Sequence, residues 1–420
     1  MCVYQFIKTI GVSLLFVTST VLFANELTLA ESEQIALDSD FITKEFNARS
    51  ESLNERAIAD GQLPDPKIKL GLMNMPVNSF DRGQEPMTQL QVGLQQSFPR
   101  GRTLHYKQLQ TLDIADVDEA KALDQGKKVL RSLRNSYLDV YLNVRTESIL
   151  EQNRDLFTQL FDTTQRQYAV GRDNQHDVLR AQLELALLDD RIAEIIGGKE
   201  IAIAELAKWI GNDQAQRPLP QTFPELTSIS SLDQMVSGLP SHPLIQVEDA
   251  LVRANDKNVN IAEEQYKPGW MLDFTYGERT GNNLDGSSRD DFASAMIVMD
   301  LPIFTDKRQD RRLAASKLEH IASRYARSDR LLELKRQIEK EHANWVRQGK
   351  RLELYETRAV VDAAQNSEST LKAYQNDLAD FTTLMRARLI ELNTQIDMLK
   401  IRINRAKSQA NLLYFSGEIL

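Results

Sequence analysis

The chain has 420 residues, 26% of them charged, and a formal net charge of −9 at pH 7. Such an acidic surface repels phosphate backbones, so nucleic acid is excluded as an expected partner. The single cysteine, Cys2, cannot form an internal disulfide, and no later segment carries an apolar run long enough to cross a bilayer as a helix.

Residues 1–24 predict a signal peptide. Lys8 precedes an apolar run from Ile10 to Phe23, and a small residue precedes the expected cleavage site at Asn25. A retained transmembrane helix is the competing interpretation, and it is weaker because the run is shorter than the roughly 18 residues that a span requires. Cys2 lies on the wrong side of that run for lipid attachment, so we expect an exported chain without a lipid anchor.

The first structural unit, residues 25–211, begins with a helical segment and continues into a β-hairpin over residues 67–98. Two prolines in Leu63-Pro64-Asp65-Pro66 end the helix, because proline fixes φ and removes a hydrogen-bond donor. The hairpin is predicted by alternation between an apolar and a polar face. The apolar positions are Ile68, Leu70, Leu72, Leu90, Val92 and Leu94, and the polar ones include Gln89, Gln91 and Gln95. Each strand is expected to have about ten residues, as a tilted membrane strand requires.

A long helical hairpin follows, with no proline between Pro99 and Pro218. Its apolar residues recur at spacings of three and four, which is typical of coiled-coil packing. At about 1.5 Å per residue, a helix from Gly101 to Gln167 is on the order of 100 Å long. The pair Gly197-Gly198 predicts a local break in the second helix of this hairpin.

A second unit, residues 241–420, repeats this order after a proline-containing linker over residues 212–240. Its helix, its β-hairpin over residues 269–301 and its long helical hairpin follow their counterparts by about 202 to 206 residues. The matched positions are Asp40 and His242, Pro66 and Pro268, Pro99 and Pro302, and Gly171 and Asp377. We therefore expect an internal duplication.

Two hairpins give four amphipathic strands, and four strands cannot close a membrane barrel. A dimer would supply eight strands and a nearly filled lumen, whereas a trimer supplies twelve and leaves room for a channel. The expected fold class is therefore mixed α and membrane β. By the same closure, we expect the long helices to pack side by side into a helical cylinder that continues the channel.

Four short motifs occur in order along the mature chain. They are Leu27-Thr28-Leu29-Ala30, Leu63-Pro64-Asp65-Pro66, Val92-Gly93-Leu94-Gln95-Gln96-Ser97-Phe98-Pro99, and Tyr168-Ala169-Val170-Gly171 followed by Asp177-Val178-Leu179. On the duplicated frame, they resemble the TolC-type outer-membrane efflux proteins over essentially the whole mature chain. Asn74-Met75-Pro76 and the Gln-Ser-Phe-Pro segment look most similar to the CzcC-like heavy-metal branch of that family.

The resemblance implies a homotrimer with a 12-stranded outer-membrane β-barrel, continued by a long periplasmic α-helical coiled-coil barrel. It implies a passive exit duct for substrates, heavy-metal cations in that branch, embedded in outer-membrane lipid. It also implies docking through the helix-hairpin tips onto a periplasmic adaptor protein, which couples the duct to an inner-membrane pump of the RND type. The tips correspond to residues 168–179 and 374–385. The expected adaptor-contact residues are Tyr168, Gly171, Asp177, Val178, Leu179, Tyr374 and Leu384.

The resemblance further implies a pore constriction at the second tip, where family members carry acidic residues. Counted from Asp377, those positions hold Thr383 and Arg386, so this chain departs from the acidic pattern. The expected constriction residues are Asp377, Asp380, Thr383 and Arg386, and the preferred arrangement is a mixed ring of Asp380 and Arg386. Asp377 and Asp380 are predicted to lie one helical turn apart on one face, with a solvated surface as the competing interpretation.

No P-loop, dinucleotide-binding or nucleophile-elbow motif occurs, so we expect neither catalysis nor a cofactor. The five histidines lack paired metal-ligand spacing, and only His176, beside the first tip, suits an adaptor contact. Methionines near the strands are expected to fill packing gaps rather than to bind metal. Trp270 and Tyr276 suit an aromatic girdle, with core packing as the alternative.

Other functions compete with metal efflux. The same duct would serve multidrug efflux or type I protein secretion with different partners. A periplasmic coiled-coil scaffold, using the hairpins only as a dimerisation sheet, belongs to another class. The length and amphipathic character of the strands favour the membrane duct over the scaffold.

Overall fold

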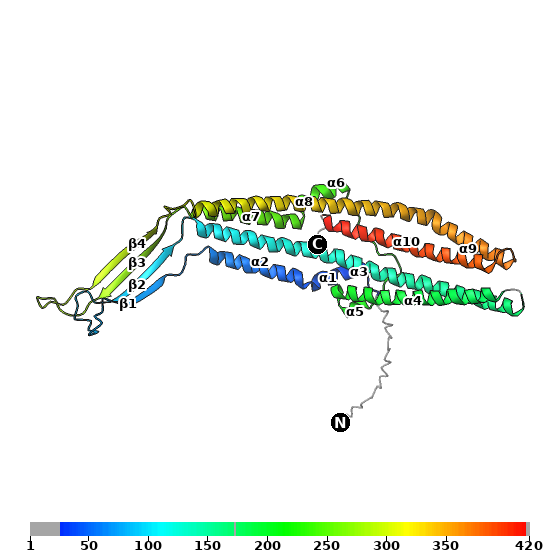
Figure 1. Cartoon of the computed structure of the whole chain (residues 1–420), viewed down its shortest axis with the longest axis horizontal. Coiled ribbons are helices and arrows are strands. Elements are labelled where there is room, and N and C mark those ends of the chain that lie inside the picture. The colour runs from blue at the N-terminus through cyan, green and yellow to red at the C-terminus, as the bar shows by residue number, and fades with distance from the viewer. Residues whose placement is uncertain (1–25, 172–173, 417–420) are drawn as a thin grey trace, which may run out of the picture.

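The computed structural model describes residues 26–171 and 174–416, so the expected signal peptide lies outside the described residues. The chain forms a long rod with a β-sheet at one end and two helix-hairpin tips at the other (Figure 1). Its longest helix, α3 (Thr103–Ala169), has 67 residues and extends on the order of 100 Å at about 1.5 Å per residue. The long helix expected from the proline-free sequence is therefore confirmed.

Shorter helices lie end to end along α3. α1 (Leu29–Ser39) and α2 (Phe41–Asp60) pack against α3, with α2 on its sheet-side half, and α4 (Gln175–Ile210) covers its tip-side half (Figure 1). Asp40 separates α1 from α2 and caps α2, because its Oδ2 accepts the Thr43 N–H at 2.9 Å.

The same order of elements recurs after residue 242. α7 (Pro243–Glu264) packs on α8 (Gln309–Leu354), and α10 (Phe381–Phe415) covers the tip-side half. A π-helical turn (Tyr355–Ala359) joins α8 to α9 (Val360–Gln375). These three elements have 46, 5 and 16 residues, the same total length as the 67-residue α3.

The segment over residues 212–240 is packed against the rod rather than being a plain linker. It holds α5 (Asn212–Ala215) and α6 (Leu232–Gly238) and leads into a 3-10 turn (Leu239–Ser241). Ala215 is buried with Leu206 and Ile210 of α4, while Met235 and Leu239 are buried against α8 and α10. Its apolar residues thus help to fill two of the cores along the rod.

The sheet contains β1 (Lys67–Met73), β2 (Gln89–Phe98), β3 (Gly269–Glu278) and β4 (Phe292–Asp300), antiparallel in that order. Residues directly opposite one another share a face. One face carries the row Ile68, Leu94, Phe274 and Ala295, and the other carries the row Lys69, Gly93, Thr275 and Ser294. The predicted alternation is therefore confirmed, and both edge strands, β1 and β4, lack a partner within the described chain.

The expectation of four strands of about ten residues was wrong for β1, which has seven. The strand stops at Asn74, whose φ of 53° lies in the left-handed region that extended strands do not use. Asn74 is fixed there by its side chain, which donates to the Met87 carbonyl at 3.1 Å, and by its carbonyl, which accepts from Thr88 Oγ1 at 2.8 Å.

The break predicted at Gly197-Gly198 was also wrong, because α4 runs without interruption to Ile210. A Cβ at Gly198 would lie 2.9 Å from Asn143 Oδ1 of α3. The glycine therefore permits close packing of α3 on α4 rather than bending the helix.

Among the described residues, no helix has both the length and the apolar character that crossing a membrane requires.

Candidate functional site

The first helix-hairpin tip is a tight turn between α3 and α4. The Val170 N–H donates to the Gln167 carbonyl at 3.3 Å, and the Gly171 N–H donates to the Tyr168 carbonyl at 3.0 Å. Gly171 then adopts a φ of 74°, which a residue with a Cβ rarely accepts. The glycine that sequence analysis placed at this tip is therefore required by the backbone.

The second tip repeats this geometry with different residues. The Leu378 N–H donates to the Ala373 carbonyl at 2.8 Å, and Asp377 adopts a φ of 56°. Asp377 thus has the backbone conformation of Gly171, in agreement with the matched positions in the sequence. In each tip the N-cap position of the next helix comes three residues later, at Asn174 and at Asp380, and only the Asp380 side chain accepts a capping hydrogen bond.

Asp377 and Asp380 do not lie one helical turn apart on a helix face, as was predicted. α9 ends at Gln375 and α10 begins at Phe381, so both aspartates belong to the turn. The reason is that Asp380 is an N-cap: its Oδ1 accepts the Thr383 N–H at 2.7 Å, which holds its carboxylate against its own helix. Asp377 remains exposed.

Charge at the second tip is mixed. Hydrogen bonds from the side chain and the backbone of Thr383 hold the pKa of Asp380 below its ordinary value, and the nearby charges of Arg386 and Arg180 lower it further. Asp380 is therefore ionised at neutral pH, beside the exposed cation of Arg386. The four residues expected at a constriction thus lie together within one turn and the start of α10.

The two tips are fixed to each other by a shared apolar core. Phe381 and Met385 of α10 are buried with Ala181 and Leu188 of α4 and with Phe157 of α3. Two polar contacts add to this core: Tyr374 Oη donates to Gln167 Oε1 at 3.0 Å, and Arg180 Nη1 donates to Thr382 Oγ1 at 3.4 Å. The tips therefore form one unit rather than two independent hairpins.

Leu384 belongs to the interior of that unit, with 0% of its surface exposed. It was expected among the adaptor contacts, but it cannot meet a partner in this packing because neighbouring helices cover it. By the matched positions of the two tips its counterpart is Val178, which is half-buried.

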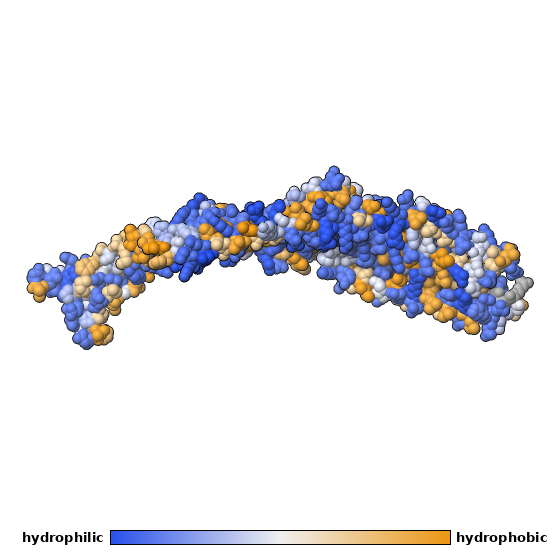
Figure 2. Space-filling view, turned by 45° about the horizontal axis from the view of Figure 1, so that its top comes forward, coloured by the Kyte–Doolittle hydropathy of each residue, from blue (hydrophilic) through white to orange (hydrophobic). Residues whose placement is uncertain are grey.

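Exposed apolar residues on α4 extend away from the first tip. Leu179, Leu183 and Leu187 are spaced by four, so they share one helix face, and they are 56%, 57% and 55% exposed. Figure 2 shows hydrophobic surface on this end of the helical body. Tyr168 is also exposed, and Asp177 and Val178 are half-buried in the first turn of α4. Leu183 and Leu187 were missed in the sequence, although their spacing from Leu179 was a usable signal.

The polar face of the sheet carries a charged pair. Lys69 Nζ lies 2.8 Å from Asp273 Oδ2 across β2, and Asp273 also accepts from Thr275 Oγ1 at 2.8 Å. Gln95 faces the same carboxylate at 3.4 Å. Lys67 sits in the row of Gln95 and Asp273, so this level of the sheet has two cations and one anion.

Trp270 is packed on one neighbour and remains partly exposed. Its ring stacks on Phe98 with centroids 4.3 Å apart and an interplanar angle of 14°, yet it remains partly exposed at the end of the apolar face.

His176 is exposed at the start of α4, whereas His242 is buried at the start of α7. Within residues 26–171 and 174–416, no three His, Cys, Asp or Glu side chains gather as a metal site.

No protein-family model matches the chain, and no curated protein resembles it in sequence. Solved structures do resemble it. The outer membrane protein VceC from Vibrio cholerae superimposes with a TM-score of 0.77 at 18% identity, over 92% of this chain and 95% of VceC. The outer-membrane channel OprN gives 0.78 at 15% identity, over 93% and 90% of the two chains. CusC, a transmembrane channel, gives 0.77 at 14% identity, over 94% and 93%.

At these levels of identity the likeness establishes the fold. Nearly the whole described chain has the fold of outer-membrane channel protomers, with a sheet of four strands at one end of a long helical body. The neighbours are membrane channel proteins rather than enzymes, which agrees with the prediction of no catalysis.

Proposed function

We propose that the chain is one of three protomers of an outer-membrane exit duct in a tripartite efflux system. The observation that carries the proposal is the four-stranded sheet with one apolar face, one polar face and two unpaired edges. Four strands cannot close, but three copies joined through β1 and β4 give a 12-stranded barrel. Its apolar face then meets lipid and its polar face meets water.

The helical body continues this duct into the periplasm. The helices beside the two long rods are nearly equal in length, with 20 and 36 residues in α2 and α4 and 22 and 35 in α7 and α10, so each protomer contributes two paired rods of similar length. Such rods pack side by side into a cylinder when three copies assemble. The duct itself is passive, and an inner-membrane pump of the RND type supplies the energy.

The tips are proposed to contact a periplasmic adaptor protein. The surface consists of Tyr168, Gly171, Asp177, Val178 and Leu179, with Tyr374 supporting the turn from the second tip. Leu384 is omitted because it is buried. The exposed apolar character of Leu179 supports the proposal, since an exposed leucine near a rigid turn suits a protein contact.

The second tip is proposed to form the constriction of the closed duct. Threefold symmetry turns each of Asp377, Asp380, Thr383 and Arg386 into a ring of three. The ring is mixed in charge, because ionised Asp380 lies beside Arg386. This differs from an all-acidic gate and gives less preference for cations.

Heavy-metal cations are the proposed substrates. This part rests on the sequence resemblance to the heavy-metal branch, with multidrug efflux and type I secretion as the alternatives. The test is growth of a deletion strain on graded zinc, cobalt, copper and silver, beside dyes, detergents and antibiotics. Sensitivity to metals alone supports a metal duct, whereas sensitivity to the organic compounds alone assigns the duct to multidrug efflux.

A further inference from the structure

The connector between β4 and α8 begins with exposed apolar side chains. Leu301, Ile303 and Phe304 are 63%, 71% and 86% exposed. The connector is nevertheless ordered, because the Ile303 N–H donates to the Leu301 carbonyl at 3.0 Å and the Arg308 N–H to the Thr305 carbonyl at 3.0 Å. It lies where the sheet meets the helical body, and Figure 2 shows a hydrophobic patch at that boundary.

The connector ends in a cluster of basic residues. Lys307, Arg308, Arg311 and Arg312 are all exposed, and within the described part of the chain none of them forms an ion pair. Asp310, which lies between them, is engaged elsewhere, because its Oδ1 accepts from Tyr266 Oη at 2.5 Å. Asp306, directly before Lys307, is also exposed, so residues 301–312 hold four cations and two carboxylates. The segment therefore carries an excess of positive charge on a chain whose formal net charge is −9.

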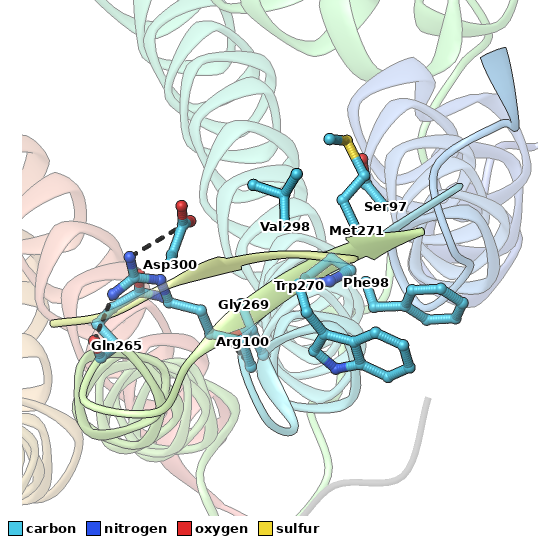
Figure 3. Close-up of a pocket in the computed structure, with 11 residues that line it drawn as sticks. Ser97, Phe98, Arg100, Gln265, Gly269, Trp270, Met271, Val298 and Asp300 are labelled. Atoms are coloured by element: carbon cyan, nitrogen blue, oxygen red, sulfur yellow. Dashed lines mark hydrogen bonds and ion pairs between the residues drawn. The ribbon is translucent and has the colours of Figure 1, made fainter. Parts of the chain in front are cut away.

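The corresponding junction of the first unit differs. Arg100 follows β2 as the basic cluster follows β4, but its guanidinium is occupied (Figure 3): Nη1 donates to the Gln265 carbonyl at 2.7 Å, and Nη2 lies 3.5 Å from Asp300. The connector from β2 to α3 also lacks counterparts of the exposed Ile303 and Phe304, since it is four residues shorter. Of these two strand-to-helix connectors, only the one after β4 combines cations without ion pairs and exposed apolar side chains in the described chain.

Aromatic rings mark the level at which the apolar face of the sheet ends. Phe98, Trp270 and Met299 form the last row of that face, and Phe98 stacks on Trp270. Figure 3 shows both rings on the opposite side of the strands from Met271 and Val298. Aromatic rings concentrate at the boundary between hydrocarbon and headgroups. Leu301 comes two residues after Met299, and the basic cluster then lies at headgroup level.

We propose that the segment 301–312 is a binding site for anionic phospholipid in the leaflet that faces the helical body. The apolar side chains enter the acyl region, while Arg308, Arg311, Arg312 and Lys307 bind the phosphate of the headgroup. Guanidinium groups bind phosphate through paired hydrogen bonds, and basic clusters beside a bilayer select anionic lipids. Exposed apolar side chains directly beside exposed cations match the acyl chains and the phosphate of a single lipid, so the segment suits this occupant. The inference rests on the proposed insertion of the sheet into a membrane.

The test measures quenching of Trp270 fluorescence by brominated lipid. The full-length protein is purified in detergent and reconstituted into vesicles of phosphatidylcholine containing either brominated phosphatidylglycerol or brominated phosphatidylcholine. The other tryptophans, Trp209 and Trp345, lie in the helical body away from the sheet and give a constant background. We expect phosphatidylglycerol to be preferred over phosphatidylcholine by roughly tenfold or more.

The variant carries Lys307→Gln, Arg308→Gln, Arg311→Gln and Arg312→Gln. We expect the ratio of its preference for phosphatidylglycerol over phosphatidylcholine to fall to about one. A matched control removes four exposed basic residues farther along α8 with Lys340→Gln, Arg347→Gln, Lys350→Gln and Arg351→Gln, and it should keep the preference.

Four results overturn the inference. A wild-type protein with no lipid preference, or a variant that retains the preference, removes the lipid site while leaving the duct in place. A variant that no longer forms trimers assigns the cluster to the contact between copies. Absence of quenching by either brominated lipid shows that the sheet does not enter the bilayer, and then the proposed function fails together with the site.

Discussion

His242 is a buried titratable residue at the start of α7, with 4% of its surface exposed. Its Nδ1 accepts the Leu244 N–H at 3.2 Å, so the ring proton belongs on Nε2, which lies 3.2 Å from the Tyr414 carbonyl. Burial holds the pKa of His242 below its ordinary value. The charges of Lys127 and Lys128 lower this pKa further, whereas the charge of Asp124 raises it. The native structure therefore needs the neutral imidazole.

This requirement predicts a dependence of stability on pH. As the pH falls below about 6.5, the unfolded chain gains a proton at His242 that the native chain resists, so the free energy of unfolding decreases until the pH passes the native pKa. His242→Asn keeps an N-cap without a titrating group. Thermal unfolding between pH 7.5 and 5 should show a smaller loss of Tm in the variant than in the wild type. Parallel pH profiles in the two proteins would remove His242 from this role.

The two tips provide a matched pair of backbone positions. Gly171 and Asp377 share the left-handed conformation, with φ of 74° and 56°. Gly171→Ala should destabilise the first tip by about 1 kcal/mol, and Asp377→Gly should stabilise the second by up to about 1 kcal/mol, because only glycine adopts this region without steric cost. Amide hydrogen exchange at each tip measures the change locally. Equal exchange in both variants and the wild type would contradict the strain assigned to Asp377.

At the scale of elements, the polar face of the sheet predicts ion selectivity. Asp273 compensates one of two lysines at its level, so Asp273→Asn should shift selectivity toward anions and Lys69→Gln toward cations. Reversal potentials across planar bilayers in a salt gradient measure both shifts. Asp285→Asn, in the loop between β3 and β4, changes charge by the same amount outside the strands and serves as the control. Unchanged potentials in both strand variants would place this face away from the lumen.

The exposed face of α4 predicts a second effect at this scale. Leu179→Asp should abolish substrate export and leave trimers intact, because it places a charge in the proposed adaptor contact. Leu187→Asp lies two turns farther from the tip on the same face, with the same exposure, and is the matched control for position. Resistance assays measure export, and cross-linking measures whether the trimers remain intact. If Leu179→Asp retains full resistance, the adaptor contact does not include this residue.

Much of this element-level structure could be predicted from the sequence, for physical reasons that particular residues make clear. Alternation on β2 and β3 identified both faces of the sheet, since side chains point to opposite sides with a period of two. Proline-free periodicity identified α3. β1 ended early because the left-handed Asn74 is held by contacts with Met87 and Thr88, which are remote in sequence.

The candidate site was harder to predict from the sequence than the helices and strands were. The residue type of Asp380 does not distinguish a helix interior from an N-cap. Asp380 is the N-cap of α10 because a turn follows the end of α9. Leu384 and Leu179 are the same residue type at similar distances from their turns, yet one is buried and one is exposed. That difference comes from the packing of α10 against α4, which depends on contacts between the two halves of the chain.

At the scale of the whole molecule, one chain leaves several surfaces incomplete. β1 and β4 are unpaired edges, and the apolar face of the sheet is open to its surroundings. Exposed edges and exposed apolar strands promote association, so a stable protein must cover them. Closure by three copies covers the edges with one another and places the apolar face in lipid, which accounts for both features at once.

The mass of the complex released from outer membranes in mild detergent tests this closure most directly. Native mass spectrometry should give three chains per complex, and the complex should resist dissociation until it is heated. A complex of one or two chains, or a protein recovered only from the soluble periplasmic fraction, would contradict the 12-stranded barrel and the duct built upon it.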